Sequence, residues 1–186
     1  KKNKLEIICA EIKNEPPVIS TDNLANIPSV KSRLEHDDMP SGSTECGLIY
    51  TSGSTGKPKG CILNNDYFLY AGHWYNTIGG LIEIKPGEER LLTPLPLNHM
   101  NAMACSSMAM IMSGGCIIQL DRFHPKTWWE NVRSSKATII HYLGVLPAIL
   151  LEQPESEDHN FSEQIKFGFG AGVNPKHHEI FEKRFG

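Results

Sequence analysis

Short apolar runs alternate with amphipathic segments along this chain of 186 residues, and no other feature limits its possible folds so strongly. The runs are short and often β-branched, so they predict buried strands. Strands joined through right-handed crossover helices lie parallel in a sheet. The sequence therefore predicts an α/β fold, in which helices flank a mainly parallel sheet. The predicted strands are residues 5–10, 46–51, 90–93, 116–120, 138–142 and 165–169.

Asparagine, proline and glycine mark the predicted ends of the helices. Asn64 or Asn65 can cap a helix that closes at the glycines 79–80, and the next helix closes at the glycines 114–115. Residues 170–172, which follow the last predicted strand, predict a turn. The predicted helices are residues 65–78, 98–113, 125–134, 147–151 and 175–184.

Composition argues against several classes of protein. The formal net charge of -3 does not suit a nucleic-acid-binding surface, which needs a basic excess. Five cysteines without a C-x-x-C pair suit reduced thiols in the cytoplasm. The longest apolar stretch, residues 100–112, is interrupted by polar residues and is too short to cross a bilayer. Because the chain lacks an initiator Met and stops after a helix-like segment, we expect an internal fragment of a longer cytoplasmic protein.

The glycine-rich segment Tyr50–Gly60 follows a predicted strand and carries the clearest chemical signal. Its glycines allow backbone amides to approach an anion closely, and Lys57 and Lys59 supply positive charge for phosphate oxygens. Its hydroxyl groups add donors, and a threonine oxygen can also reach a magnesium ion. A flexible linker would gain nothing from a strand that leads into it. The segment therefore predicts a nucleotide-phosphate-binding loop. The hydroxyl groups belong to Thr51, Ser52, Ser54 and Thr55.

The spacing of the loop excludes two common phosphate-binding motifs. The P-loop requires G-x-x-x-x-G-K-[ST], but here Pro58 follows Lys57 where Ser or Thr should stand. The pattern G-x-G-x-x-G also fails, because two residues separate Gly53 from Gly56.

The segment Thr51–Gly60 resembles the signature loop of the adenylate-forming superfamily, [ST]-[SG]-G-[ST]-T-G-x-P-K-G, at every position. Two later segments resemble further motifs of that superfamily in the same order. Leu95–Met100 is similar to a proline-bearing strand that ends in a histidine, and Gly168–Pro175 is similar to the glycine turn against which adenine packs. The resemblance covers residues 45–186. Residues 90–154 are most similar to the acyl-CoA synthetases, in particular the crotonobetaine/carnitine-CoA ligase branch.

This resemblance implies a partial N-terminal AMP-binding domain over residues 1–186, in which residues 1–44 are a lead-in strand and connection. It implies that ATP and Mg²⁺ activate a carboxylic acid to an acyl-adenylate, which is then transferred to coenzyme A. His99, between the acyl pocket and the nucleotide, and Lys59 are the implied catalytic residues, and Thr55 would lie near the metal. The implied nucleotide-binding residues are Thr51, Ser52, Gly53, Ser54, Thr55, Gly56, Lys59, Gly170, Ala171 and Gly172.

The chain departs from the superfamily pattern at its end. It stops before a Y-G-x-T-E motif, whose Glu helps to hold magnesium, and before the ribose-binding Asp and the C-terminal domain with its catalytic Lys. We therefore expect residues 1–186 alone to be inactive. Two alternatives stay open: an amino-acid adenylation domain that loads a carrier protein, and a nucleotide-binding member without catalysis. The acid that is activated and the formation of a homo-oligomer also stay open.

Two groups of apolar residues have packing interpretations. The methionines of residues 100–112 could form a flexible binding face, but their helical spacing favours a place in the core. For Trp128 and Trp129 we expect one ring to pack inward and the other to cover the surface.

Two groups of residues that contain histidines have both a binding and a structural interpretation. His177 and His178 are adjacent on a helix, so they point about 100° apart and are expected on the surface, without a shared metal ion. His141, Tyr142 and Gly144 follow a strand whose end opens into the ligand crevice of such sheets. They line the acyl pocket or simply end a strand, and the sequence leaves both interpretations open.

Overall fold

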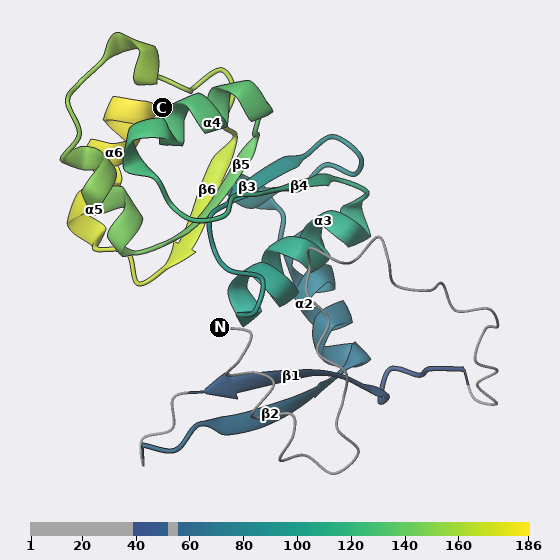
Figure 1. Ribbon diagram of the computed structural model, residues 1–186. Helices are drawn as coiled ribbons and strands as arrows, with labels where there is room; N and C mark the ends of the chain where they lie inside the picture. Colours follow the sequence, from purple (N-terminus) through teal and green to yellow (C-terminus); the bar gives the residue numbers. More distant parts are fainter. Residues whose placement is uncertain (1–38, 52–55) are drawn as a thin grey trace, which may run out of the picture. The chain divides into compact units, whose positions relative to one another are not determined.

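The computed structural model describes residues 39–51 and 56–186, of which Pro40–Gly186 form one compact unit with two sheets (Figure 1). The smaller sheet is an antiparallel hairpin of β1 (Glu45–Thr51) and β2 (Lys59–Asn64). The larger sheet has the order β4-β3-β5-β6, and all neighbouring strands are parallel. Its strands are β3 (Arg90–Thr93), β4 (Cys116–Gln119), β5 (Ile139–Leu143) and β6 (Phe167–Ala171). The predicted α/β fold is confirmed, while the predicted strand 5–10 lies outside the described residues.

The helices follow the predicted order. Asn64 caps the first of them, because its side chain accepts a hydrogen bond of 3.0 Å from the Tyr67 amide. Gly114 closes α3 with a φ of 69°, as predicted from the sequence. In the described part of the chain, no helix is long and apolar enough to span a bilayer. The helices are α2 (Asn65–Thr77), the π-helix η3 (Asn101–Ser106), α3 (Ser107–Ser113), α4 (Trp128–Ser135), α5 (Val145–Leu151) and α6 (His178–Phe185).

Helices cover both faces of the larger sheet, since successive residues of a strand point to opposite faces. Leu91 and Ile139 are partners in register and share one core cluster with residues of α3. The next pair, Leu92 and Ile140, shares the other cluster with residues of α4 and α6. The strand order places β4 on one side of β3 and β5 on the other, so the chain reverses its direction across the sheet at β3. This reversal is a topological switch point, where sheets of this kind bind ligands at the carboxyl ends of their strands.

Several predicted boundaries were wrong. Strand β2 was not predicted, because its first residues, Lys59 and Gly60, belong to the loop motif and its apolar run 61–63 is very short. Gly170 and Ala171 were predicted in a turn but lie in β6, where they pair with Tyr142 and Leu143. The predicted helix 98–113 begins as a π-helix, and the predicted helices 125–134 and 175–184 both begin with a 3₁₀ turn.

The prediction for the tryptophan pair was also wrong, because both rings are buried. Trp128 is 1% exposed and Trp129 is 4% exposed. The Trp129 ring stacks on Phe161 with a centroid distance of 5.0 Å and meets Phe185 at 4.3 Å. Aromatic residues of α6 and of the segment before β6 therefore pack against α4 in the core.

The methionines are only partly in the core. Met110 is 1% exposed, as a core residue should be, whereas Met100 and Met112 are 40% and 43% exposed. They lie on sides of the η3–α3 segment that do not face the sheet, so the predicted core position is wrong for these two.

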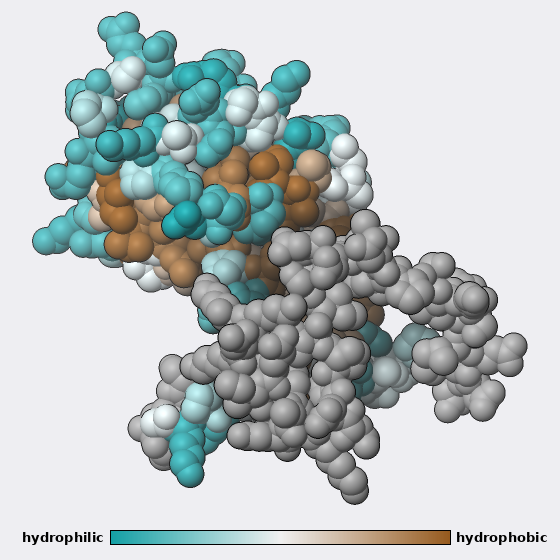
Figure 2. Space-filling view, in the orientation of Figure 1, coloured by the Kyte–Doolittle hydropathy of each residue, from teal (hydrophilic) through white to brown (hydrophobic). Residues whose placement is uncertain are grey.

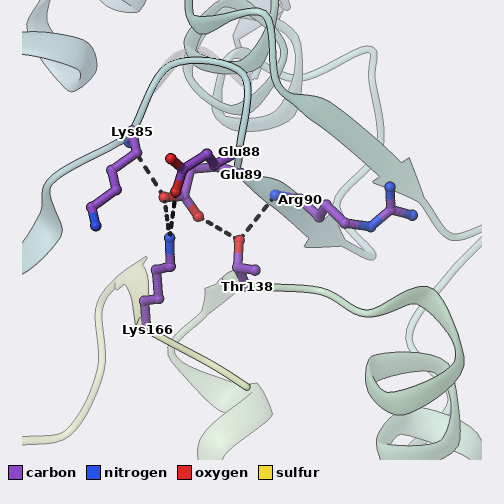
Figure 3. Close-up of polar contacts among 6 residues, drawn as sticks. All are labelled: Lys85, Glu88, Glu89, Arg90, Thr138 and Lys166. Carbon is purple, nitrogen blue, oxygen red and sulfur yellow. Dashed lines mark hydrogen bonds and ion pairs between the residues drawn. The ribbon is translucent and has the colours of Figure 1, made fainter. Parts of the chain in front are cut away.

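A polar cluster joins the amino-terminal ends of three strands (Figure 3). The Glu89 carboxylate, before β3, accepts a hydrogen bond of 2.5 Å from Thr138 before β5 and one of 2.7 Å from Lys166 before β6. The Thr138 hydroxyl also accepts a hydrogen bond of 2.9 Å from the Arg90 amide, so it donates one hydrogen bond and accepts one. This cluster fixes the starts of β3, β5 and β6 at the edge opposite to their carboxyl ends.

Candidate functional site

The hairpin holds the two ends of the predicted phosphate loop. Thr51 ends β1, Lys59 begins β2, and the two are partners across the hairpin. The Thr51 hydroxyl also donates to the Lys59 carbonyl at 3.5 Å, and both residues are exposed. Gly56 has a φ of 82°, as expected in a tight glycine-rich loop. The predicted residues Ser52, Gly53, Ser54 and Thr55 lie outside the described residues.

The remaining predicted residues gather at the carboxyl edge of the larger sheet. Because β3, β5 and β6 are parallel, the segments that follow them leave from the same edge. His99 follows β3, Gly144 follows β5 and Gly172 follows β6. His99 and Gly172 share this edge but are separated by β5, and the loop stem belongs to the other sheet. The described structure therefore divides the predicted site into a hairpin group and an edge group.

The turns after β5 and β6 touch through their backbones. The Gly144 amide donates to the Ala171 carbonyl at 2.9 Å. A Cβ on Gly144 would lie 1.9 Å from the Gly172 carbonyl oxygen, so no larger residue fits without movement of one turn. This contact explains why Gly144, which the sequence linked to the acyl pocket, must be glycine.

The end of β6 presents bare backbone to open space. Gly170, Ala171 and Gly172 are all exposed. Gly172 has a φ of 69°, and no atom of the described residues lies within 4 Å of the position that its Cβ would take. The Tyr142 ring lies against Gly170, where a Cβ would come within 2.6 Å of the Tyr142 Cδ2 atom, so the open position is that of Gly172. The segment therefore fits the adenine-packing role that the resemblance implies.

The segment that carries His99 is tied to two strands. The Thr93 hydroxyl accepts the Leu95 amide at 3.2 Å, and the Gln119 side chain donates to the Leu95 carbonyl at 2.9 Å. His99 itself is exposed, and its amide donates to the Pro96 carbonyl at 3.1 Å. Sequence reasoning missed Gln119, because its role depends on β4 lying beside β3.

Apolar side chains lie around this edge. Leu97 and Met100, after β3, are 48% and 40% exposed, and Leu143 and Val145, at the end of β5, are 38% and 60% exposed. Figure 2 shows apolar surface on the side of the sheet at which β6 ends. The edge thus offers apolar surface close to the exposed backbone of β6.

His141 and Tyr142 do not face the same site. They are adjacent on β5, so their side chains point to opposite faces of the sheet. His141 is 3% exposed and stacks on Phe169 with a centroid distance of 4.1 Å, while Tyr142 packs with the α4–α6 core. Burial lowers the pKa of His141 to about 4, so the ring is neutral at physiological pH. Of the two interpretations that the sequence left open, a pocket lined by both His141 and Tyr142 is therefore excluded.

His141 has a buried hydrogen-bond partner in the π-helix η3. Its Nδ1 atom is bonded to the hydroxyl of Ser106, which is 0% exposed. The Ser106 hydroxyl also donates to the Asn101 carbonyl at 3.3 Å, five residues earlier. Sequence reasoning treated Ser106 only as a polar interruption of an apolar stretch, and no local pattern marks its pairing with His141.

No metal centre made of protein ligands alone occurs in residues 39–51 and 56–186, where no three His, Cys, Asp or Glu side chains gather suitably. His178 is exposed as predicted, whereas His177 is half-buried. The predicted metal-binding residue, Thr55, lies outside the described residues.

Two cavities lie away from the carboxyl edge. One of about 970 Å³ lies along α5 and α6, and one of about 460 Å³ lies between α6 and the β5–β6 part of the sheet. Among the described residues, neither cavity is lined by the loop residues 50–51 and 56–60, by His99 or by Gly170–Gly172. The geometry therefore gives no reason to move the candidate site to these cavities.

Known proteins are similar to this chain in both sequence and fold. A family model described as AMP-binding enzyme matches residues 2–186. The chain is 34% identical over 160 residues to the very long-chain fatty acid transport protein of Cochliobolus heterostrophus, covering 86% of this chain and 24% of that protein. It is 25% identical over 141 residues to the crotonobetaine/carnitine–CoA ligase of Citrobacter koseri, covering 75% of this chain and 26% of that protein.

The fold matches solved structures of o-succinylbenzoate-CoA synthetase from Bacillus subtilis. A double mutant of that enzyme with a bound product analogue has a TM-score of 0.74 and 21% identity, covering 89% of this chain and 33% of that one. A complex of the same enzyme with ATP and magnesium has a TM-score of 0.65 and 22% identity, covering 83% and 32%. The chain thus spans about a quarter to a third of the length of these proteins.

Proposed function

Because the chain belongs to the AMP-binding enzyme family, we propose that the full-length protein is an AMP-forming acyl-CoA synthetase. In the first step a carboxylate attacks the α-phosphorus of ATP, which releases pyrophosphate and leaves an acyl-adenylate. In the second step the thiol of coenzyme A attacks the acyl carbon, which releases AMP and leaves a thioester. The observation that carries this proposal is the loop motif Thr51–Gly60, whose ends are fixed by the hairpin pair Thr51 and Lys59.

The phosphate loop would stabilise the negative charge of the leaving pyrophosphate. Negative charge shifts onto the leaving pyrophosphate during the first step, and fixed donors stabilise that charge without reorganising. Lys59 and the backbone amides and hydroxyls of residues 51–56 would hold the β- and γ-phosphates. Thr55 would lie near Mg²⁺, which neutralises phosphate charge when it is bound. The B. subtilis synthetase that shares this fold binds ATP with magnesium, which supports the assignment.

The carboxyl edge would hold the remaining parts of the acyl-adenylate. The exposed backbone of Gly170–Gly172 would pack against adenine, with the open position at Gly172. His99 would orient the carboxylate between the nucleotide and the acyl group. The apolar side chains beside it, among them Leu97 and Met100, would contact the acyl chain.

The named relatives leave two classes of acid to compare. A crotonobetaine/carnitine–CoA ligase is 25% identical to this chain, and a very long-chain fatty acid transport protein is 34% identical over a longer segment. Residues 90–154 resemble the crotonobetaine/carnitine-CoA ligase branch. On that resemblance we propose a small acid of the crotonobetaine/carnitine type as the specific substrate, with coenzyme A rather than a carrier protein as the acceptor. Residues 1–186 would then be part of the N-terminal domain of a cytoplasmic enzyme.

The test is a screen of pyrophosphate release by the full-length protein. Crotonobetaine, carnitine, butyrate, palmitate and the standard amino acids would be supplied separately, each with and without coenzyme A. The proposal expects release with the small acids, and AMP and thioester in equal amounts when coenzyme A is present. Pyrophosphate release with palmitate but with none of the small acids would replace the proposed substrate class by long-chain fatty acids. Release with amino acids, and no effect of coenzyme A, would favour the carrier-protein alternative.

A further inference from the structure

The backbone directly after His99 has an unusual form. Residues Asn101–Ser106 form a π-helix, in which backbone hydrogen bonds join residues five apart instead of four. Such turns are rare and persist where neighbouring contacts support them. Here two side chains match the wider turn, because the hydroxyls of Ser106 and Ser107 donate to the carbonyls of Asn101 and Ala102, each five residues earlier.

The two serines differ in one respect. Ser107 donates to Ala102 at 2.7 Å, and no other hydrogen bond of its side chain is found in the described structure. Ser106, which is 0% exposed, is bonded to Asn101 and also to His141 of β5, 35 residues away in sequence. One hydroxyl therefore connects the first residue of the π-helix to the sheet.

The Ser106 hydroxyl lies between two partners. It carries one proton, so it either donates to the Asn101 carbonyl and accepts from Nδ1 of His141, or donates to Nδ1 of the other tautomer. Both arrangements keep the bond between Ser106 and His141, which links the π-helix to β5.

The His141 ring is held firmly by its neighbours. It stacks on Phe169, its partner in register on β6, with an interplanar angle of 24°. Tyr75 of α2 packs against the same Phe169 with a centroid distance of 5.0 Å. Because His141 lies on a central strand and in this stack, it is a fixed point to which the π-helix can be tied.

The tied turn includes the backbone of His99. The Met103 amide donates to the His99 carbonyl at 2.9 Å, and Asn101 lies two positions after His99. A shift of the first turn of η3 would therefore move His99.

We propose that the Ser106–His141 pair is a positioning device, which holds the π-helix so that the exposed His99 side chain has its productive place at the carboxyl edge. This inference rests on the proposed function, since the productive place is defined by the carboxylate and the nucleotide. Neither Ser106 nor His141 touches the reacting atoms.

The test measures acid-dependent ATP–pyrophosphate exchange in the full-length protein. Ser106→Ala removes the link, and Ser107→Ala is the matched control, because it removes the same type of bond without any contact to the sheet. His141→Leu removes the partner, whereas His141→Asn keeps an amide donor close to the place of Nδ1. Each substitution is made in the wild type and in a His99→Ala background, and thermal melting checks that each variant is folded.

We expect Ser106→Ala and His141→Leu to lower kcat about tenfold or more, because small displacements of a positioned group are costly. KM for ATP should change less than about twofold, while Ser107→Ala and His141→Asn should stay close to wild type. In the His99→Ala background Ser106→Ala should have no further effect, since a positioning residue acts only through its target.

Two results overturn the inference while leaving the proposed function intact. One is an active wild type in which Ser106→Ala and Ser107→Ala lower kcat equally. The other is a Ser106→Ala substitution that lowers kcat by the same factor in the His99→Ala background as in the wild type. That result would indicate a structural role. A wild type with no exchange for any acid overturns the proposed function and this inference with it.

Discussion

At the scale of single residues, Lys57 and Lys59 flank Pro58 where the chain leaves the loop, and both are exposed. They differ in position, because Lys59 is the strand partner of Thr51 and Lys57 is not part of the hairpin. Lys59→Ala in the full-length protein should slow adenylation about 100-fold, as removal of a charged donor from a phosphate site does, and should slow thioester formation from the acyl-adenylate much less. Lys57→Ala removes the other lysine of the loop, which lies outside the hairpin, and should have a smaller effect than Lys59→Ala. Equal losses in both half-reactions, measured separately, would argue against the assigned role of Lys59.

His141 should make the stability of the protein sensitive to acid. Burial lowers its folded pKa to about 4 from an ordinary 6.5, so the fold favours the neutral ring. This contribution is complete above the ordinary pKa and declines as the pH falls towards the folded pKa. Between about pH 7 and about pH 5, unfolding by denaturant should therefore show a loss of about 2 kcal/mol that is absent in His141→Asn. The same pH dependence in the variant would contradict a buried neutral His141.

At the scale of elements, the cluster of Figure 3 joins three strands that are distant in sequence. Burial alone would raise the pKa of Glu89, but the hydrogen bonds from Lys166, Thr138 and the Lys85 amide outweigh it and lower that pKa. The charged Glu89 therefore stabilises the fold above the ordinary carboxyl pKa, and this contribution is lost as the pH falls below it. Its pH window lies below that of His141.

Glu89→Gln should lower the free energy of unfolding by about 1–3 kcal/mol, because a buried charge-assisted network loses its charge. Glu88→Gln is the control: Glu88 lies 3.9 Å from the same Lys166 Nζ but is 63% exposed, so its effect should stay within about 0.5 kcal/mol. Denaturant unfolding near neutral pH measures both. Similar losses in the two variants would mean that the cluster does not link the strands as the distances indicate.

The elements also show why sequence reasoning succeeded or failed. Strand 90–93 and the Asn64 cap were predicted because a short apolar run and a capping side chain act locally. Strand β2 was missed, since its partner β1 supplies the reason for it to be a strand. The π-helix was missed because it depends on Ser106, whose second partner lies on β5. Features that need a distant partner left no pattern in the sequence.

At the scale of the whole molecule, the α/β class and the parallel sheet could be predicted, but the strand order could not. Alternation of strands and helices predicts parallel pairing, whereas the placement of β4 and β5 on opposite sides of β3 is decided by packing. The loop motif and His99 define the candidate site from the sequence, and their roles stay predictions. Its supports, Gln119 and the contact between Gly144 and Gly172, became visible only in three dimensions.

The central claim is that the loop Thr51–Gly60 serves the transfer of AMP to a carboxylic acid. Exchange of labelled pyrophosphate into ATP by the full-length protein, with and without an acid and without coenzyme A, tests it most directly. Exchange should require the acid and magnesium, and should fall about 100-fold in Lys59→Ala. A protein that binds ATP but shows no acid-dependent exchange with any carboxylic acid would contradict it.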